Sequence, residues 1–138
     1  MILVFGKTGQ IAIELQRSSD VLALGRDQAD LSEPDACVQS IQTFAPSAVI
    51  NAAGYTAVDK AEVDEENAII INGDSPTAIA QACAEMKIPL LHISSDYVFE
   101  GSGNEPWKPC DIKAPQNAYG RSKLAGEEGV RDSGAIHA

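Results

Sequence analysis

The chain has 138 residues, 44% of them hydrophobic but only 5% aromatic, which predicts one domain with a mainly aliphatic core. A formal net charge of −10 argues against partners that attract clustered Lys and Arg, namely nucleic-acid backbones and anionic membranes. Three cysteines without a CxxC pair favour free thiols in a reducing compartment, two buried and one in a loop. Because neither a secretory leader nor a long apolar run is visible, we expect a cytoplasmic protein without a membrane span.

Short apolar runs alternate with longer amphipathic stretches along the chain. In chain order, the first part is predicted to contain a strand at Ile2–Phe5, a helix at Gln10–Arg17, a strand at Val21–Gly25, a very short strand within Gln28–Leu31, and a helix from Pro34 that stops before Pro46. The second part is predicted to contain a strand at Ala48–Gly54, an exposed acidic helical turn with a solvated face at Asp59–Glu66, a helix capped by Ser75–Pro76, a strand at Pro89–Ser94, a long loop at Asp96–Gln116, and a helix start within Gln116–Gly129.

This alternation of strands and helices predicts an α/β fold, a Rossmann-like doubly wound parallel sheet with helices on both faces. Sheets of this kind bind ligands outside the carboxyl ends of their strands. The strand order that we infer is 3-2-1-4-5, with the very short strand counted third. Pro89–Ser94 would then be an exposed apolar edge, open to pairing with another chain.

The first predicted strand leads directly into a glycine turn with the sequence GKTGQIA. Gly6 allows the tight turn, Gly9 lets the backbone approach a pyrophosphate, and Ala12 is small enough for helix and sheet to pack closely. Because the turn follows a strand and opens a helix, it predicts a dinucleotide site. It is not a P-loop, since Lys7 comes too early.

The end of the second predicted strand indicates which dinucleotide binds. An acidic residue there would hold the 2′-hydroxyl of NAD, but this chain has Arg26, followed by Asp27. The planar guanidinium of Arg26 can accept the 2′-phosphate of NADPH, and the alternative is a loop arginine in solvent. We therefore predict NADPH, with NADH tolerated, and expect Asp30 and Leu31 to flank the adenine.

A second group of candidate residues lies beyond the last predicted strand. Ser95 follows that strand, and Tyr119 and Lys123 stand four residues apart on a predicted helix. A nearby ammonium lowers the pKa of a Tyr hydroxyl, which can then give its proton to a carbonyl oxygen while hydride reaches the carbon. A Ser hydroxyl would hold that oxygen in place. Each feature is weak alone, but together with the glycine turn they predict a nicotinamide-dependent ketone reductase.

Four motifs give the chain a more specific resemblance: GKTGQ, NAAGYTAVDKAE, ISSDYVFEG and YGRSKLAGE. Together they resemble the extended short-chain dehydrogenase/reductase family and, within it, the dTDP-4-dehydrorhamnose reductases, over Ile2–Glu127. The resemblance implies reduction of the C4 ketone of dTDP-4-dehydro-L-rhamnose by NADPH or NADH, giving dTDP-L-rhamnose for surface polysaccharide. The chain departs from the pattern at Ser95, where members usually carry Thr, but both residues offer a hydroxyl.

The resemblance also implies a role for individual motif residues. It implies that the pyrophosphate is held by Gly6, Thr8, Gly9, Gln10 and Ile11, the adenine by Asp30 and Leu31, and the rest of the cofactor by Ala53, Gly54, Tyr55, Thr56 and Ile93. It implies catalysis by Ser95, Tyr119 and Lys123, the last two also at the cofactor, and contact with the sugar by Ser95, Asp96 and Tyr97. No cluster with metal-ligand spacing is present, so no protein-held metal is expected.

The length of the chain departs from this family, whose members are considerably longer. We therefore expect residues 1–138 to form a single NAD(P)-binding Rossmann domain that is truncated before the substrate-binding part, with possible completion by another chain or as a homo-oligomer. Two alternatives stay open: a non-catalytic NAD(P)-binding fragment or regulatory subunit, and another nucleotide-sugar epimerase or dehydratase. Among the other residues, His92 is expected to be a packed core histidine, Trp107 to anchor its loop, and His137 to be disordered.

Overall fold

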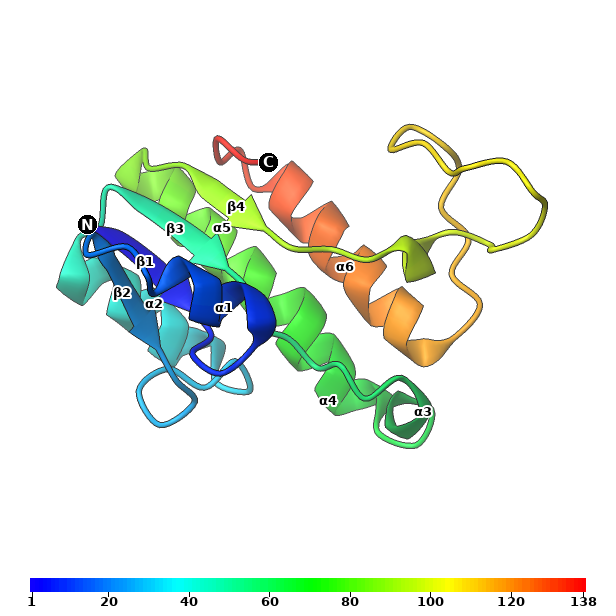
Figure 1. Ribbon diagram of the computed structural model, residues 1–138, viewed down its shortest axis with the longest axis horizontal. Helices are drawn as coiled ribbons and strands as arrows, with labels where there is room; N and C mark the ends of the chain where they lie inside the picture. Colours follow the sequence, from blue (N-terminus) through cyan, green and yellow to red (C-terminus); the bar gives the residue numbers. More distant parts are fainter.

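Four parallel strands form the sheet at the centre of the computed structural model, which describes residues 1–138 (Figure 1). The strands are β1 (Ile2–Phe5), β2 (Val21–Leu24), β3 (Ala48–Asn51) and β4 (Leu90–His92). Their order is β2-β1-β3-β4, and every pairing between neighbours is parallel. The predicted α/β fold with a doubly wound parallel sheet is therefore confirmed.

Helices connect the strands and lie on both faces of the sheet. In chain order they are α1 (Gln10–Leu15), α2 (Pro34–Phe44), α3 (Val58–Ala61), α4 (Glu65–Ile69), a π segment (Ile70–Asp74), α5 (Ser75–Met86), a 3₁₀ turn (Asp96–Val98) and α6 (Ala118–Asp132). In the view of Figure 1, α1 lies in front of the sheet, whereas α2 and α5 lie behind it. None of these helices combines the length and the apolar character that crossing a membrane requires.

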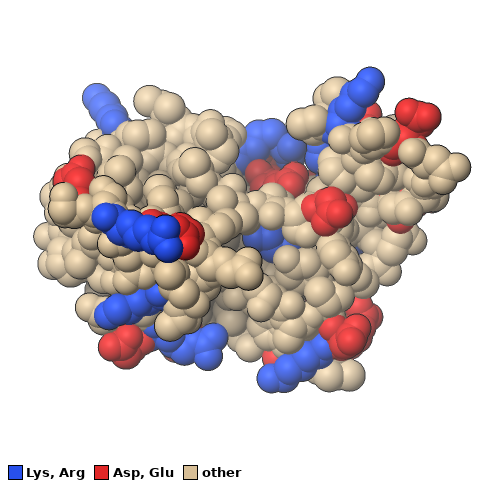
Figure 2. Space-filling model, in the orientation of Figure 1, with Lys and Arg blue, Asp and Glu red and all other residues tan.

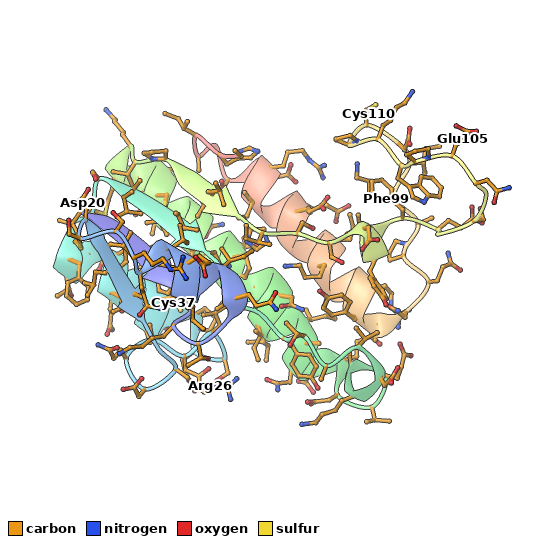
Figure 3. All side chains as sticks on the ribbon, in the orientation of Figure 1. Asp20, Arg26, Cys37, Phe99, Glu105 and Cys110 are labelled. Atoms are coloured by element: carbon orange, nitrogen blue, oxygen red, sulfur yellow. The ribbon has the colours of Figure 1, made fainter.

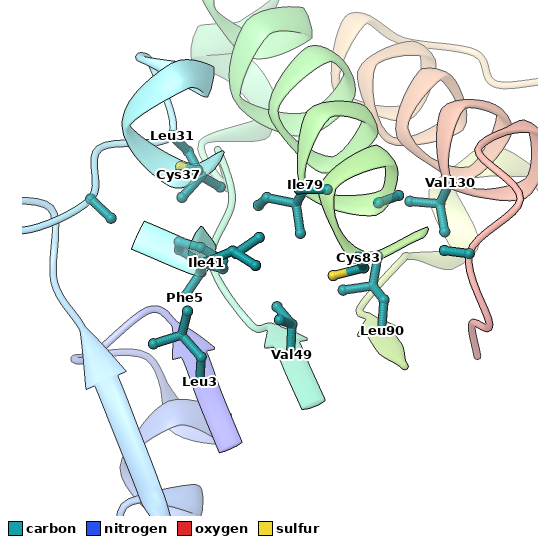
Figure 4. Close-up of a cluster of buried hydrophobic side chains, with 14 of the residues drawn as sticks. Leu3, Phe5, Leu31, Cys37, Ile41, Val49, Ile79, Cys83, Leu90 and Val130 are labelled. Atoms are coloured by element: carbon teal, nitrogen blue, oxygen red, sulfur yellow. The ribbon is translucent and has the colours of Figure 1, made fainter. Parts of the chain in front are cut away.

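The main core lies between the sheet and the helices behind it (Figure 4). Its large side chains come from all four strands and from α2, α5 and α6: Leu3, Phe5, Leu24, Val49, Leu90, Ile41, Ile79 and Val130. Cys37 and Cys83 lie in the same core, where burial raises the pKa of each thiol to about 11. Cys110 is exposed, so the predicted set of free thiols, two buried and one in a loop, is confirmed.

The predicted short strand within Gln28–Leu31 is wrong, because this stretch forms a turn. The amides of Gln28 and Ala29 both donate to the Gly25 carbonyl, at 3.0 and 2.9 Å. Ala29 and Leu31 are nevertheless buried, since their side chains pack into the main core. Their apolar character therefore reflects core packing and not strand pairing.

The predicted helix start at Ser75–Pro76 is also wrong, because α4, the π segment and α5 form one continuous helix. Ser75 has helical backbone angles (φ −63°, ψ −48°), and its hydroxyl donates to the Leu31 carbonyl at 2.6 Å. Pro76 has no N–H for the carbonyl four residues earlier, and its ring would crowd that carbonyl in an α-helix. The wider π turn in front of Pro76 relieves this conflict and lets the helix continue.

The outer edge of β4 is covered by the last residues of the chain, so the predicted exposed edge is wrong. The Leu90 amide donates to the Ile136 carbonyl at 2.8 Å, and the Ala138 amide donates to the Leu90 carbonyl at 3.1 Å. The His92 amide donates to the Ala138 carbonyl at 3.0 Å, and His137 forms a parallel bridge with Leu90 instead of being disordered. Because α6 is a crossover helix, it returns the chain to the side of β4, where parallel pairing is possible.

The face of the sheet opposite the main core is partly uncovered over β3 and β4. Leu90 points into the core, whereas the next residue, Leu91, points to the other face and is 40% exposed. Leu91 borders an apolar hollow of about 340 Å³ together with Ile2, Ile50 and Ile136. The two faces of the sheet are therefore covered unequally.

The long loop after the 3₁₀ turn stands away from the sheet and is held together by an aromatic stack (Figure 3). The planes of the Phe99 and Trp107 rings are nearly parallel, at an angle of 5°, and the rings stack with centroids 5.2 Å apart. The Lys113 ammonium lies 5.1 Å from the centroid of the Phe99 ring, within the range of a cation–π contact. The prediction that Trp107 anchors its loop is confirmed.

α6 packs so closely against the continuous helix that two of its glycines have no room for a side chain. A methyl group at Gly126 would overlap the carbonyl oxygen of Asn72 in the π segment, and one at Gly129 would overlap the Thr77 hydroxyl in α5. Glycine lowers helix propensity, so its presence here reflects the close approach of the two backbones. This contact fixes α6 against the π segment.

Gly126→Ala is expected to destabilise the chain by about 1–3 kcal/mol, because the new methyl group must push α6 away from Asn72. Urea denaturation followed by circular dichroism measures the loss. Glu128→Ala, at an exposed position of the same helix, is the control and should change the free energy of unfolding by less than about 0.5 kcal/mol. Equal stability of Gly126→Ala and the wild type would contradict the close approach.

Candidate functional site

The glycine turn between β1 and α1 borders open space. Gly6 has φ 109°, and a side chain there would press on the backbone of Ala52 and Ala53 at 3.3 Å. At Gly9, by contrast, a methyl group would meet no atom within 4 Å. Ala12 is fully buried where α1 packs on the sheet. This geometry fits the three roles that the sequence predicts, namely a tight turn, a backbone open to a ligand, and close helix packing.

A small cavity at the carboxyl ends of the strands brings several predicted cofactor residues together. It measures about 70 Å³ and is lined by Gly6, Leu24, Arg26, Ala29, Asp30, Leu31, Ala53, Gly54 and Ile71. Ile71 of the π segment is a member that sequence reasoning missed, because an apolar helical residue predicts only a core position. The cavity does not include the other predicted cofactor residues, namely Thr8, Gly9, Gln10, Ile11, Tyr55, Thr56, Ile93, Tyr119 and Lys123.

Arg26 stands at the rim of this cavity with its side chain in solvent (Figure 3). The side chain is 80% exposed, and its Nε lies 3.8 Å from one carboxylate oxygen of Asp30. The other oxygen of Asp30 accepts from the Ser32 amide at 2.9 Å, which fixes the carboxylate. A surface ion pair of this kind contributes little to stability, so Arg26 can turn toward a ligand at small cost.

Lys123 of α6 is buried and binds the carboxyl end of β4. Only 5% of the residue is exposed, and its ammonium donates to the Ile93 carbonyl at 2.6 Å. Burial lowers the pKa of Lys123 to about 8, an effect that the Glu127 carboxylate opposes. Tyr119, one turn earlier on α6, is half-buried, so the predicted Tyr/Lys pair lies on one face of the helix.

Ser95 caps the 3₁₀ turn that follows β4. Its hydroxyl oxygen accepts from the Tyr97 amide at 3.2 Å, and the hydroxyl lies 3.4 Å from an Asp96 carboxylate oxygen. The Tyr97 ring meets the Tyr119 ring edge to face, with centroids 5.3 Å apart. No hydrogen bond joins Ser95 to Tyr119 or Lys123, so the structure sets the predicted trio on neighbouring elements without a direct link.

Asn72, buried in the π segment, ties the loop after β3 to α6. Its side-chain oxygen accepts from the Tyr55 amide at 2.8 Å, and its nitrogen donates to the Tyr55 carbonyl at 3.0 Å and to the Ser122 hydroxyl at 2.9 Å. Ser122 in turn donates to the Tyr119 carbonyl at 2.7 Å. Sequence reasoning missed Asn72; the signal was one amide inside the apolar stretch AIIINGD, since a buried amide needs partners.

The acidic segment Asp59–Glu66 was predicted to be only a solvated face, but two of its residues bind the start of α6. The prediction is therefore wrong for Glu62 and Glu65. The Glu62 carboxylate accepts from the Ala118 amide at 2.8 Å. Ala118 is the first residue of α6, and a negative charge there is stabilised by the positive end of the helix dipole. Glu65 binds Arg121 at two points, 2.7 and 3.1 Å. Both partners lie 56 residues further along the chain, a distance at which local charge patterns carry no information.

His92 forms a part-buried pair with Asn51 across β3 and β4. Because the Asn51 oxygen accepts from the Ala53 amide at 3.2 Å, its nitrogen is the donor to His92 Nδ1, also at 3.2 Å. This contact requires a neutral imidazole with its proton on Nε2, a buried atom without a partner. Burial, and then the charge of Lys123, lowers the pKa of His92 to about 4. The prediction of a packed histidine is confirmed.

Comparison with known proteins gives this site a family. The family model described as the RmlD substrate binding domain matches residues 1–138. The chain belongs to this family. It is 42% identical over 144 residues to the dTDP-4-dehydrorhamnose reductases of Salmonella typhimurium and Escherichia coli, an alignment that covers 99% of this chain and 48% of each relative. The resemblance found in the motifs is thereby confirmed, and the chain spans about half the length of the curated relatives it matches.

Solved structures agree with this family. A dTDP-4-dehydrorhamnose reductase ortholog from Clostridium acetobutylicum superposes with a TM-score of 0.92 at 33% identity. The dTDP-4-dehydrorhamnose reductase from Bacillus anthracis in complex with NADP superposes with a TM-score of 0.92 at 30% identity. Each match covers 99% of this chain and 50% of the solved chain. UDP-glucose 4-epimerase from Brucella ovis, at 19% identity and a TM-score of 0.82, shares the fold alone.

His92 is expected to make the folded chain sensitive to acid. Its pKa is about 4 in the folded chain and 6.5 without the fold, so the unfolded state takes up a proton first as the pH falls. Stability is therefore lost as the pH drops below about 6.5, and the loss continues to about pH 4. Between about pH 7.5 and pH 5 the expected loss is about 2 kcal/mol, measured by urea denaturation at both pH values.

His92→Gln should lose about 2 kcal/mol less than the wild type over the same pH range. His137→Gln, which removes the exposed histidine, is the control and should follow the wild type. Identical pH dependence in His92→Gln and the wild type would show that His92 is not held neutral.

Proposed function

We propose that this chain is the dinucleotide-binding half of a dTDP-4-dehydrorhamnose reductase. The reaction is the NADPH-dependent reduction of the C4 ketone of dTDP-4-dehydro-L-rhamnose to dTDP-L-rhamnose. The observation that carries the proposal is the burial of Lys123 one turn from Tyr119, with its ammonium on the carbonyl of Ile93, close in sequence to Ser95. Lysine is seldom buried, and a lysine with a lowered pKa is typical of functional sites. The 42% identity to reductases of this name supports the same reading.

The residues of the β1–α1 turn fit a nicotinamide dinucleotide. Gly9 borders open space, so its backbone can approach a pyrophosphate, and Gly6 gives the turn its left-handed bend. Arg26 is free at the rim of the adjacent cavity to take a 2′-phosphate, and the relative from Bacillus anthracis is named as a complex with NADP. NADPH is therefore the proposed cofactor, with NADH tolerated; when bound, it supplies the hydride.

The proposed task of this chain's own residues is proton transfer to the C4 oxygen of the sugar. Tyr119 gives its hydroxyl proton to that oxygen, and the Ser95 hydroxyl holds the oxygen in place. The Lys123 ammonium stabilises the phenolate left on Tyr119, because opposite charges attract strongly in partly buried surroundings. Asp96 and Tyr97, which follow Ser95, contact the sugar.

The proposed function also implies the partners and the cellular location of the protein. A nucleotide sugar is the small-molecule partner, and the protein works in the cytoplasm. Nucleic acid is not a partner: the net charge is −10, and Figure 2 shows Lys and Arg scattered over one face instead of gathered in a patch. Residues 1–138 form one NAD(P)-binding domain, and the substrate-binding part comes from further residues, another chain or a second copy.

A second candidate function is NAD(P) binding without turnover. The observation that favours it is that no hydrogen bond joins Ser95 to Tyr119 or Lys123, whereas the glycine turn is open to a dinucleotide. An epimerase or dehydratase activity is less favoured, because the epimerase from Brucella ovis is only 19% identical to this chain, against 42% for the named reductases.

A single cuvette that contains the chain, NADPH and dTDP-4-dehydro-L-rhamnose separates these functions. A reductase consumes NADPH absorbance, and Tyr119→Phe should slow the consumption by about 100-fold or more while nucleotide fluorescence still reports binding. Fluorescence change without consumption would favour binding without turnover. No change in either signal would contradict both candidates.

Gly9→Ala is expected to weaken NADPH binding by about tenfold or more, because the methyl group would occupy the space proposed for the pyrophosphate. Fluorescence titration measures the affinity. Ile13→Ala, a change at a half-exposed position of the same helix, is the matched control and should bind like the wild type. Unchanged affinity in Gly9→Ala would place the dinucleotide elsewhere.

A further inference from the structure

Glu127 stands one helical turn beyond Lys123 on α6 and has no ion-pair partner. Tyr119, Lys123 and Glu127 follow one another at intervals of four residues, which puts them on one face of the helix. The ion pairs of the structure involve other carboxylates. The hydrogen bond that Glu127 does make is with the Ser94 hydroxyl, which donates to Oε1 at 2.5 Å.

Ser94 fixes this carboxylate beside the carboxyl end of β4. Ser94 follows Ile93, whose carbonyl accepts from the Lys123 ammonium at 2.6 Å. Two consecutive residues after β4 therefore hold the two opposite charges of α6, the ammonium on Ile93 and the carboxylate on Ser94. A hydrogen bond to a carboxylate is a strong one, so the position of the negative charge is set before any ligand arrives.

The nearby cations do not neutralise Glu127. Lys113 and Arg131 border the same cavity of about 390 Å³ as Glu127. Lys113, however, donates to the backbone carbonyls of Pro109 and Asp111, and Arg131 lies 3.8 Å from the carboxylate of Asp132. The charge of Glu127 remains available to act on Lys123.

Other titratable groups reach this part of α6 from the elements packed against it. His92 of β4 is neutral in its pair with Asn51, as the hydrogen bonds require. Glu62 and Glu65 are engaged at the start of α6. The titratable groups around this part of α6 are His92 from β4, Asp96 and Tyr97 from the 3₁₀ turn, Glu62 and Glu65 from the acidic segment, Lys113 from the long loop, and Tyr119, Glu127 and Arg131 from α6. Among these, Glu127 is the negative charge whose attraction counters the burial of Lys123.

We propose that Glu127 is a positioning residue that acts through Lys123: its carboxylate, held by Ser94, keeps the Lys123 ammonium charged at neutral pH. The inference rests on the proposed function, in which a charged Lys123 stabilises the phenolate of Tyr119. Burial alone favours the neutral amine, and a fixed carboxylate one turn away opposes that preference, more strongly in these partly buried surroundings than in water. The Ser94–Glu127 hydrogen bond then sets the position of the charge that acts on Lys123, in addition to joining α6 to the end of β4.

Direct titration of Lys123 tests this inference without any turnover. The 138-residue chain is prepared with lysine labelled at Cε, the Lys123 resonance is assigned with Lys123→Arg, and its pH titration is followed by NMR. Glu127→Gln keeps an acceptor for Ser94 but removes the charge, whereas Ser94→Ala keeps the charge but removes the hydrogen bond. Glu128→Gln removes one charge at an exposed position next to Glu127 and is the matched control.

The midpoint of Lys123 is expected to fall by about one pH unit in Glu127→Gln, by less in Ser94→Ala, and not at all in Glu128→Gln. An unchanged midpoint in Glu127→Gln would overturn the inference and leave Ser94–Glu127 as a structural contact. Equal falls in Glu127→Gln and Glu128→Gln would overturn it too, since they would report only net charge. If Glu127→Gln does not fold, Glu127→Ala, which also removes the charge, replaces it, and a midpoint no lower than in the wild type would then overturn the inference.

The same variants separate this inference from the proposed function. If the reductase reaction occurs, the alkaline limb of its pH profile should move down in Glu127→Gln together with the Lys123 midpoint. A moved midpoint without any turnover would leave the role of Glu127 standing and remove the reductase proposal. Turnover with an unchanged Lys123 midpoint would support the reductase proposal and overturn the role of Glu127.

Discussion

The contact between the α6 backbone and the Asn72 carbonyl is the constraint on which the rest of the site depends. Because Gly126 has no side chain, α6 lies directly on the π segment. From that position Asn72 reaches both Tyr55 and Ser122, and Lys123 reaches the end of β4, at distances of 2.6 to 3.0 Å. A helix that stood off by the width of a methyl group could not make these contacts, which tie α6 to the loop after β3 and to β4.

The close packing of α6 also buries the basic groups of the site, and burial favours their neutral forms. The pKa of Lys123 falls to about 8 and that of His92 to about 4, in each case mainly through the loss of water. The two residues also affect each other, since the Lys123 charge makes protonation of His92 still harder. The ordered polar contacts and the shifted charge states therefore have one origin, the close packing of α6 on β4 and the π segment.

Local sequence patterns predicted those parts of the fold that depend on local chemistry. Ile2–Phe5 followed by a glycine turn predicted a strand and its sharp exit, and the spacing of Tyr119 and Lys123 predicted a shared helical face. The errors share a physical cause, which is a partner far away in the sequence. Leu31 packs in the core instead of pairing in a strand. The Ser75 hydroxyl donates to a carbonyl 44 residues away, and Glu62 accepts from an amide 56 residues away. Asn72 was not predicted as a site residue for the same reason, since its partner Ser122 lies 50 residues further along the chain.

The pairing of Ile136–Ala138 with β4 has a practical consequence for handling the protein. These residues complete the hydrogen bonds of Leu90 and His92, so an affinity tag fused after Ala138 would begin on the sheet itself, next to the residues that flank Lys123. A tag placed before Met1 would instead leave the molecule at the amino ends of the strands, on the side of the sheet away from the glycine turn.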